Sequence, residues 1–268
     1  MDTISVTKFL QRVPQYKRMH REFEWYVQTV GNSYEYDESV CDFNLYMENG
    51  VFMELFIRKC LCKRFGMWCK DERAETFLER HNFRDYYLEQ QLANAYAAYT
   101  DPEEKAMNIV EDIKLVAMTH SQNFYENAGL ALTDYSVNYQ NLKEVVKFIN
   151  QLPYKYFQYK VPCGFDFGHC ILSGLPDYVF DDRVFCQVAT SKYPRVYRRK
   201  FAQVLFYILS HYEQNDYAEG MSKMYTVMIY NPLLGKNYTA DILMTPDMYE
   251  DLQYRIEGDM QEVIQCYF

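Results

Sequence analysis

The sequence predicts an α/β fold in which helices surround a mixed β-sheet. Helical patterns occupy much of the first 150 residues, strand patterns cluster between 154 and 190, and a helix, a hairpin and a last helix follow. This order is typical of a helical layer packed around a sheet. Hydrophobic residues make up 49% of the chain and aromatic residues 18%. That composition supplies a packed core and argues against disorder.

The helices are predicted from apolar spacing and from their start signals. Asp101 and Pro102 indicate a helix start, since Asp caps the first turn and Pro fits its geometry. That helix is expected to run to about His120. The spacing also predicts helices over 44–66, 83–99, 139–150 and 246–265.

The length of 268 residues favours one domain, 1–268, with a helical insertion at about 70–150. The core strands are expected between about 154 and 244, and the carboxyl-terminal helix at about 246–265. The insertion exceeds what a minimal core needs, so it would serve as a lid or a docking surface. Individual strands are predicted near 154–161, 167–172, 177–180 and 183–190, followed by a hairpin over 224–242.

The run from Gly174 to Lys192 has the layout of a metal-dependent nuclease core. Such a core needs a carboxylate at the end of one strand and a second about ten residues later, in the next strand. It also needs a lysine two residues further on, because residues i and i+2 of a strand share a face. Asp177 fills the first position, but the second is Gln187 and the lysine position is Ala189.

This layout resembles the PD-(D/E)XK (restriction-endonuclease-like) superfamily. The resemblance implies that Asp177 and Gln187 would hold Mg²⁺ or Mn²⁺, weakly because the amide is neutral. Ala189 can do no proton or charge chemistry. Lys192, three residues further on, is the candidate for a displaced lysine. The substitutions therefore indicate a core that has lost catalytic activity. The alternative is an active core in which Lys192 takes the role of the missing lysine.

Three further segments resemble the RecB-like exonuclease branch of that superfamily. Gln203 and Tyr207 lie one turn apart on the helix after the would-be catalytic strand. Residues 4–16 are similar to that branch's opening helix, and residues 49–55, with Glu54, to its Gly-x-x-x-His-Glu helix. The family's His is Met53 in this chain, and Val13 replaces the Cys before Pro14 that ligates an iron–sulfur cluster in some relatives. We therefore expect no iron–sulfur cluster.

The net charge of −9 argues against indiscriminate binding to nucleic acid, which depends on Lys and Arg at phosphates. A basic cluster nevertheless follows the would-be catalytic strand, with Tyr193 and Tyr197 interleaved. It is where a nuclease would hold its substrate backbone; a solvated loop and helix start is the alternative. The basic cluster comprises Lys192, Arg195, Arg198, Arg199 and Lys200.

The eight cysteines show no disulfide-framework spacing. Cys60, Cys62 and Cys69 could be metal ligands, but the apolar helix pattern around Cys60 favours buried thiols. There is no signal peptide and no stretch of eighteen apolar residues. We expect a soluble cytoplasmic protein without membrane association. The high tyrosine and low glycine content hints at a virus- or phage-encoded component.

Three functions remain open at this point. The first is a catalytically degenerate nuclease-like protein that binds DNA, acting in a replication, packaging or virion assembly. The second is an active Mg²⁺- or Mn²⁺-dependent DNA exonuclease that uses Asp177, Gln187 and the displaced Lys192. The third is a structural or protein-interaction module that does not bind DNA, consistent with the acidic charge.

Overall fold

The computed structural model describes residues 2–33, 43–80, 86–120, 138–167, 170–191, 193–195 and 197–265. Its contacts divide the chain into two compact units. The first unit consists of Met1–Thr29, Tyr154–Asn231 and Lys236–Phe268; the second consists of Val30–Pro153 and Pro232–Gly235. The sequence predicts one domain with an insertion at about 70–150. The second unit begins forty residues earlier than that insertion, and so takes in the helix predicted at 44–66.

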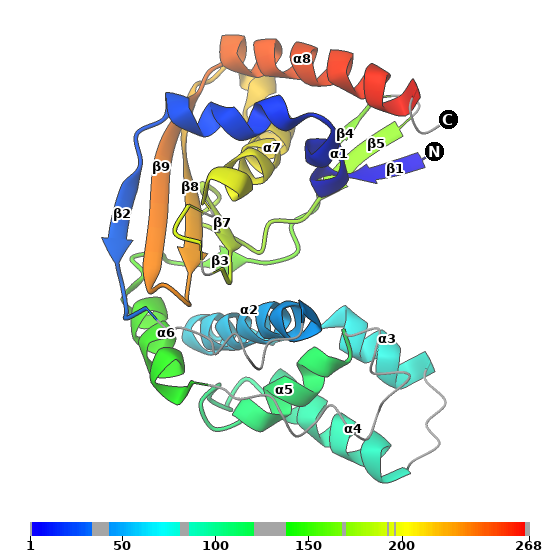
Figure 1. The fold of residues 1–268 in the computed structure, drawn as a ribbon, viewed down its shortest axis with the longest axis vertical. Helices are drawn as coiled ribbons and strands as arrows, with labels where there is room; N and C mark the ends of the chain where they lie inside the picture. The colour runs from blue at the N-terminus through cyan, green and yellow to red at the C-terminus, as the bar shows by residue number, and fades with distance from the viewer. Residues whose placement is uncertain are drawn as a thin grey trace. The chain divides into compact units, whose positions relative to one another are not determined.

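A six-stranded mixed sheet dominates the first unit (Figure 1). Strands β7 and β8 run parallel, whereas their other neighbours in the sheet are antiparallel. The α/β class is therefore confirmed, as is the hairpin predicted over 224–242. In sheet order the strands are β2 (Tyr26–Thr29), β9 (Lys236–Met244), β8 (Lys223–Asn231), β7 (Val184–Val188), β6 (Tyr178–Phe180) and β3 (Phe157–Gln158).

A separate three-stranded sheet holds the amino terminus. Its order is β1 (Asp2–Ser5), β5 (Cys170–Gly174) and β4 (Cys163–Asp166), with β1 parallel to β5. The opening helix expected over 4–16 is thus wrong at its start, because residues 2–5 pair with β5. Helix α1 (Val6–Arg12) begins only after Ser5, whose hydroxyl caps it by accepting from the Lys8 N–H. The 3-10 segment η1 (Pro14–Glu22) follows.

Helix α7 (Tyr197–Asn215) connects the parallel strands β7 and β8 and lies beside them (Figure 1). Such a crossover is how parallel neighbours are joined. Its Phe201, Leu205 and Ile208 are fully buried in the core of the unit. Helix α8 (Pro246–Gln265) spans the range predicted for the last helix and contributes Ile256 and Met260 to the same core.

The second unit is helical among its described residues. The helices predicted over 44–66 and 139–150 are confirmed, and 83–99 is confirmed from residue 86 onward, since 81–85 lie outside the described residues. The unit contains α2 (Phe43–Phe65), α3 (Glu72–Arg80), α4 (Tyr86–Thr100), α5 (Val110–Met118) and α6 (Tyr139–Gln151).

The helix start predicted at Asp101 is wrong, since α5 begins at Val110. Asp101 does cap a backbone group, because its carboxylate accepts from the Glu103 N–H at 2.8 Å. Its carbonyl, however, accepts a hydrogen bond from the buried Lys59 ammonium, which also binds the Tyr99 carbonyl at 2.8 Å. Lys59 thereby closes the end of α4 in a turn, and the segment does not continue as a helix.

The prediction of buried thiols is confirmed for Cys62 and Cys69, whereas Cys60 is only partly buried. Cys62 and Cys69 are almost completely buried and free. Within the described residues, no group of three or more His, Cys, Asp or Glu side chains is placed to hold a metal ion. None of the described helices is both long and apolar enough to cross a membrane.

Candidate functional site

Strands β6 and β7 place Asp177 opposite Gln187. Tyr178 pairs with Cys186 in the antiparallel ladder, so one further step sets Asp177 across from Gln187. The Asp177 carboxylate Oδ2 also accepts a hydrogen bond of 2.6 Å from the backbone N–H of Val188. Directly opposite residues of an antiparallel pair have neighbouring side chains on the same face. Asp177 and Gln187, which their spacing in the sequence predicts to be neighbours, therefore lie side by side.

Gln187 and Ala189 share the sheet face that packs against α7. Phe185 and Ala189 belong to the core that contains the buried residues of α7, and strand side chains alternate between faces. Gln187 lies between them on the same face. It is 6% exposed and Ala189 4%, so this end of β7 is enclosed rather than open to solvent.

The Gln187 side chain has an unsatisfied acceptor. Among the described residues, no hydrogen-bond partner lies within reach of its Oε1 atom. A buried polar atom without a partner costs about 1–3 kcal/mol, so ordinary packing does not account for a glutamine here. The position retains a polar group where the resemblance places a metal-binding carboxylate.

Helix α7 brings Gln203 and Tyr207 to this group. The Gln203 side-chain amide donates to the Tyr207 hydroxyl at 2.7 Å. Burial raises the pKa of Tyr207 to about 12; the hydrogen bond from Gln203 opposes the rise and the Asp177 carboxylate adds to it. Tyr207 is therefore a neutral phenol at physiological pH, close enough to Asp177 to sense its charge.

Gly174 makes room for Tyr207. A Cβ atom at Gly174 would lie 2.5 Å from Tyr207 Cε1, far inside the contact distance of two carbon atoms. The glycine that opens the nuclease-like run is thus required by the tyrosine of the next helix. The spacing of the sequence did not reveal this link.

These residues do not form a good site for a divalent cation. Mg²⁺ is usually bound through carboxylates in a near-octahedral oxygen shell, and here one carboxylate faces a neutral amide. Asp181 and Asp182, the next carboxylates along the chain, do not add charge at this end of the strands. They occupy the turn at the opposite end of the β6–β7 hairpin, where Asp181 accepts from the Lys155 N–H and Asp182 from the Tyr156 hydroxyl. That turn lies about 13 Å along the strand from Asp177.

Glu54 belongs to the second unit, on α2. Its carboxylate forms an ion pair of 2.5 Å with Arg58, which also binds Asp71 at 3.0 Å. Asp71 in turn contacts His120 at 2.8 Å. Glu54 therefore takes part in a charged network within its own unit.

The basic cluster follows β7 and continues into the first turns of α7. Arg195 is exposed, and Arg198 and Lys200 are half-buried. Tyr193, in the loop between them and β7, is 60% exposed. Lys192 lies outside the described residues, as does the side chain of Arg199.

An aromatic stack supports the start of α7. The Tyr197 ring lies 4.9 Å from Tyr238 and 4.7 Å from Trp25 between ring centroids, and the Arg198 guanidinium lies 5.7 Å from the Tyr197 centroid.

Asn231, fully buried at the end of β8, donates to the Ser191 carbonyl at 2.7 Å. The sequence pattern did not predict this role of Asn231, because an Asn-Pro pair at the end of a strand indicates only a turn.

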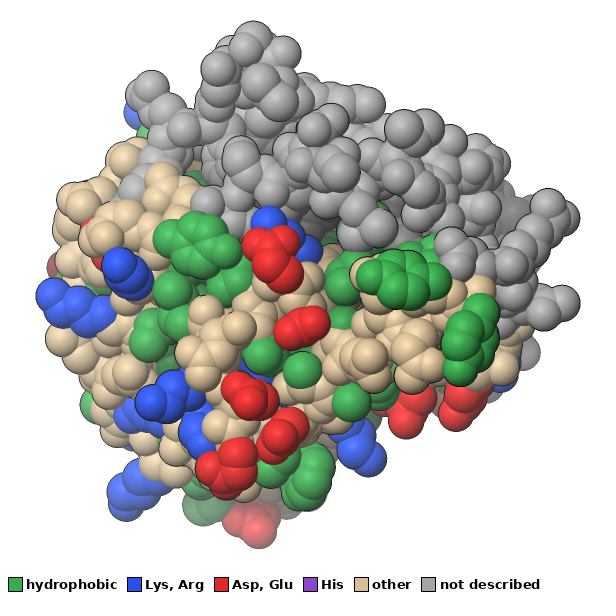
Figure 2. Space-filling model, turned by 90° about the horizontal axis from the view of Figure 1, so that it is seen from below, with side chains coloured by type: hydrophobic (Ala, Val, Ile, Leu, Met, Phe, Trp, Pro, Cys, Tyr) green, Lys and Arg blue, Asp and Glu red, His purple; other side chains and the backbone are tan. Residues whose placement is uncertain are grey.

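The wider surface carries both charge signs. The described part of the face drawn in Figure 2 carries basic, acidic and hydrophobic side chains. The net charge of −9 works against a broad positive field. An interface with nucleic acid would have to be local, as the basic cluster is.

No family model matches this chain, and no curated protein or solved structure is significantly similar to it.

Proposed function

We propose that this protein is a catalytically degenerate PD-(D/E)XK-like protein that binds nucleic acid without cleaving it, as part of a replication, packaging or virion assembly. The observation that carries the proposal is the pairing of Asp177 with Gln187 across β6 and β7, with Ala189 on the same face. This is the residue order and face expected of the nuclease core, with two of its three reactive groups replaced.

Cleavage of a phosphodiester needs charge that these residues do not supply. A metal ion or a lysine must neutralise the developing charge of the phosphoryl group, and a metal also generates the attacking hydroxide. Asp177 is already engaged by the Val188 N–H, and Gln187 adds no charge. Ala189 is buried and cannot replace a lysine. The Asp177 end of the hairpin is therefore assigned a structural rather than a reactive role.

Binding is assigned to the basic cluster. Arg195, Arg198 and Lys200 lie at the amino-terminal end of α7, where the helix dipole also favours an anion. Tyr193 offers an exposed ring beside them, and aromatic rings stack on unpaired bases. Arginines next to a tyrosine are a common combination in nucleic-acid interfaces.

A salt titration tests this assignment. Fluorescence anisotropy of labelled single- and double-stranded DNA, repeated across a range of salt concentrations, should give an affinity that falls steeply with salt. The Arg195→Ala/Arg198→Ala variant should bind several-fold more weakly, with a log–log slope smaller by about 0.9 per lost duplex phosphate contact. The matched control is Lys8→Ala/Arg21→Ala, which removes two exposed cations of the same unit elsewhere.

The same titration separates the remaining alternatives. Equal weakening by the two variants would mean that binding is not localised at α7. An absence of binding at low salt would favour a protein-interaction module, consistent with the acidic net charge. The active-nuclease alternative needs a separate incubation with Mg²⁺ or Mn²⁺, in which cleavage of the DNA would favour an active nuclease that uses Lys192.

A further inference from the structure

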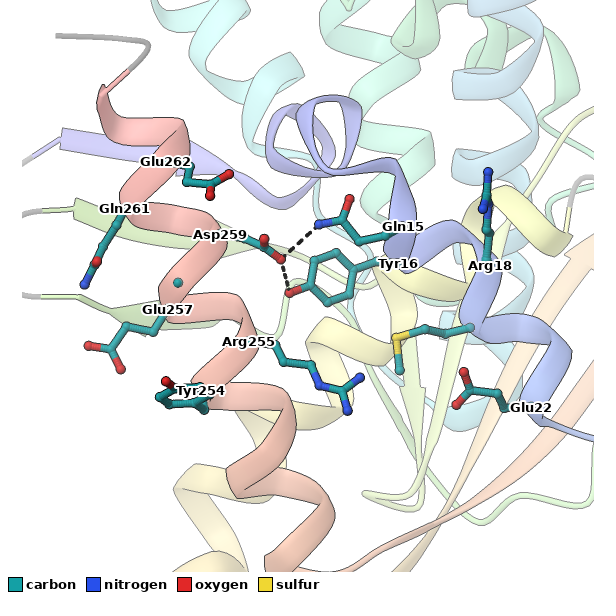
Figure 3. A pocket seen from close by; sticks show the side chains of 12 residues that line it. Gln15, Tyr16, Arg18, Glu22, Tyr254, Arg255, Glu257, Asp259, Gln261 and Glu262 are labelled. Carbon is teal, nitrogen blue, oxygen red and sulfur yellow. Dashed lines mark hydrogen bonds between the residues drawn. The ribbon is translucent and has the colours of Figure 1, made fainter.

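A groove of about 790 Å³ lies between η1 and α8 in the first unit (Figure 3). Its volume falls within the range of about 300–1,000 Å³ that is common for ligand pockets. The groove is built from segments at opposite ends of the chain, since η1 ends at Glu22 and α8 begins at Pro246. None of the residues assigned to nucleic-acid binding line it.

One carboxylate joins the two walls of the groove. Asp259 Oδ2 accepts hydrogen bonds from the Tyr16 hydroxyl at 2.6 Å and from the Gln15 side-chain amide at 3.1 Å. Tyr16 is itself 3% exposed and packs against Phe9 and Phe206 in the core. The two walls are therefore held at a set spacing, because a buried tyrosine of η1 is tied to α8.

Carboxylates predominate over guanidinium groups along the groove. Glu22 of η1 and Glu262 of α8 point toward the opposite wall, on either side of Asp259 (Figure 3). Glu257 also lines the groove, but its carboxylate points away from η1 (Figure 3). The guanidinium groups that line the groove are those of Arg18 and Arg255, and Arg255 is engaged by Asp251 at 2.7 Å. The groove thus presents an excess of negative charge to an incoming ligand.

An exposed aromatic ring stands at the rim. Tyr254 is 79% exposed and lies on α8 beside the groove. A tyrosine face attracts ammonium and guanidinium groups, and an aromatic ring next to carboxylates suits a side chain that combines an apolar stem with a cationic head. Lysine and arginine have this construction.

We propose that this groove docks a lysine- and arginine-containing segment of a partner protein. Glu22 and Glu262 would pair with the cations, Tyr254 would cover an aliphatic stem or a cationic head, and Asp259 would hold the two walls in place. The charge complementarity favours this occupant over an acidic segment or a nucleic acid, which the same carboxylates repel. The groove would link the protein to an assembly independently of any nucleic acid it binds.

Peptide binding tests the groove directly. The probes are fluorescent octalysine and octaglutamate peptides, and the measurement is anisotropy at low salt with the full chain. Octalysine should bind and octaglutamate should not. The Glu22→Gln/Glu262→Gln variant should weaken octalysine binding about fivefold, as expected for two exposed ion pairs. Tyr254→Ala should weaken it about threefold without a change of net charge.

Matched variants distinguish docking from general attraction to an acidic protein. Glu79→Gln/Glu219→Gln removes two exposed carboxylates elsewhere, and Tyr86→Ala removes another ring, which is 76% exposed. Both should leave octalysine binding unchanged within twofold. Equal losses in the groove variants and their controls would overturn the proposal, as would octaglutamate binding as tightly as octalysine. The mutated side chains are exposed, so all variants should fold.

Discussion

The Asp177 carboxylate accepts a hydrogen bond of 2.6 Å from the backbone N–H of Val188. This bond joins the residue before β6 to the last residue of β7, beyond the final ladder pair of Tyr178 and Cys186. Asp177 therefore closes the open end of the β6–β7 pair. If the proposed function is right, a residue with this structural role would be retained after catalysis is lost.

Replacing Asp177 should affect stability more than binding. Asp177→Ala removes a charge-assisted hydrogen bond, so the free energy of unfolding should fall by about 1–3 kcal/mol in urea titrations. DNA affinity of the folded variant should stay within about twofold of the parent, since the basic cluster is untouched. A stable variant that no longer binds DNA would instead mean that Asp177 takes part in DNA binding.

Introducing a second carboxylate at position 187 should create a metal site. Gln187→Glu would set a buried carboxylate opposite Asp177, and like charges at this distance disfavour the folded state. Without metal, the variant should melt below the parent. Millimolar Mn²⁺ should raise its Tm, because an ion bound only by the folded state stabilises it; the parent should show little change.

The control for that experiment is Gln187→Glu/Asp177→Asn, which keeps the new carboxylate but removes its partner. Its Tm should not respond to Mn²⁺. Equal responses of both variants would show that Asp177 and residue 187 do not act on a common ion.

The contact between Gly174 and Tyr207 should be sensitive to a single methyl group. Gly174→Ala forces the Tyr207 ring to move, because the new Cβ would lie 2.5 Å from Cε1. Overpacking of this kind costs about 1–3 kcal/mol. In a double-mutant cycle with Tyr207→Leu, the cost of Gly174→Ala should shrink. An unchanged cost would mean that Tyr207 is not what restricts residue 174.

Asp216 should make the first unit sensitive to acid. Burial would raise its pKa, but hydrogen bonds from Lys223 and Tyr225 outweigh it and hold the pKa below the ordinary value of 3.8. A depressed pKa stabilises the fold above pH 3.8, and this stabilisation is lost as the pH falls through the folded-state pKa. Asp216→Asn should cost about 1–3 kcal/mol at pH 7, and less toward pH 2. A constant difference would contradict the linkage.

Local patterns predicted much of the fold. The apolar spacing of α7, α8 and the β8–β9 hairpin placed these elements because each buries its own stripe or face in the core. The ten-residue interval from Asp177 to Gln187 likewise predicted neighbouring side chains, since a tight hairpin makes spacing along the chain equivalent to register across it.

Long-range contacts account for what the sequence analysis missed. Strand β1 exists because residues 2–5 pair with β5 across more than 160 positions. The turn after α4 depends on Lys59, about forty residues earlier in the chain. The order of the motifs along the chain grouped Glu54 with the nuclease-like residues. Its carboxylate nevertheless forms an ion pair with Arg58 in the second unit. Motif order carries no information about such pairings.

The most direct test of the account is to incubate the purified protein with end-labelled single- and double-stranded DNA in Mg²⁺ or Mn²⁺, beside Asp177→Ala. The mixtures are analysed on native gels and on denaturing gels. The account predicts DNA that is retarded on the native gel and intact on the denaturing gel, for parent and variant alike. Cleavage by the parent that Asp177→Ala abolishes would contradict it, and would mean that the site has been rebuilt as an active nuclease.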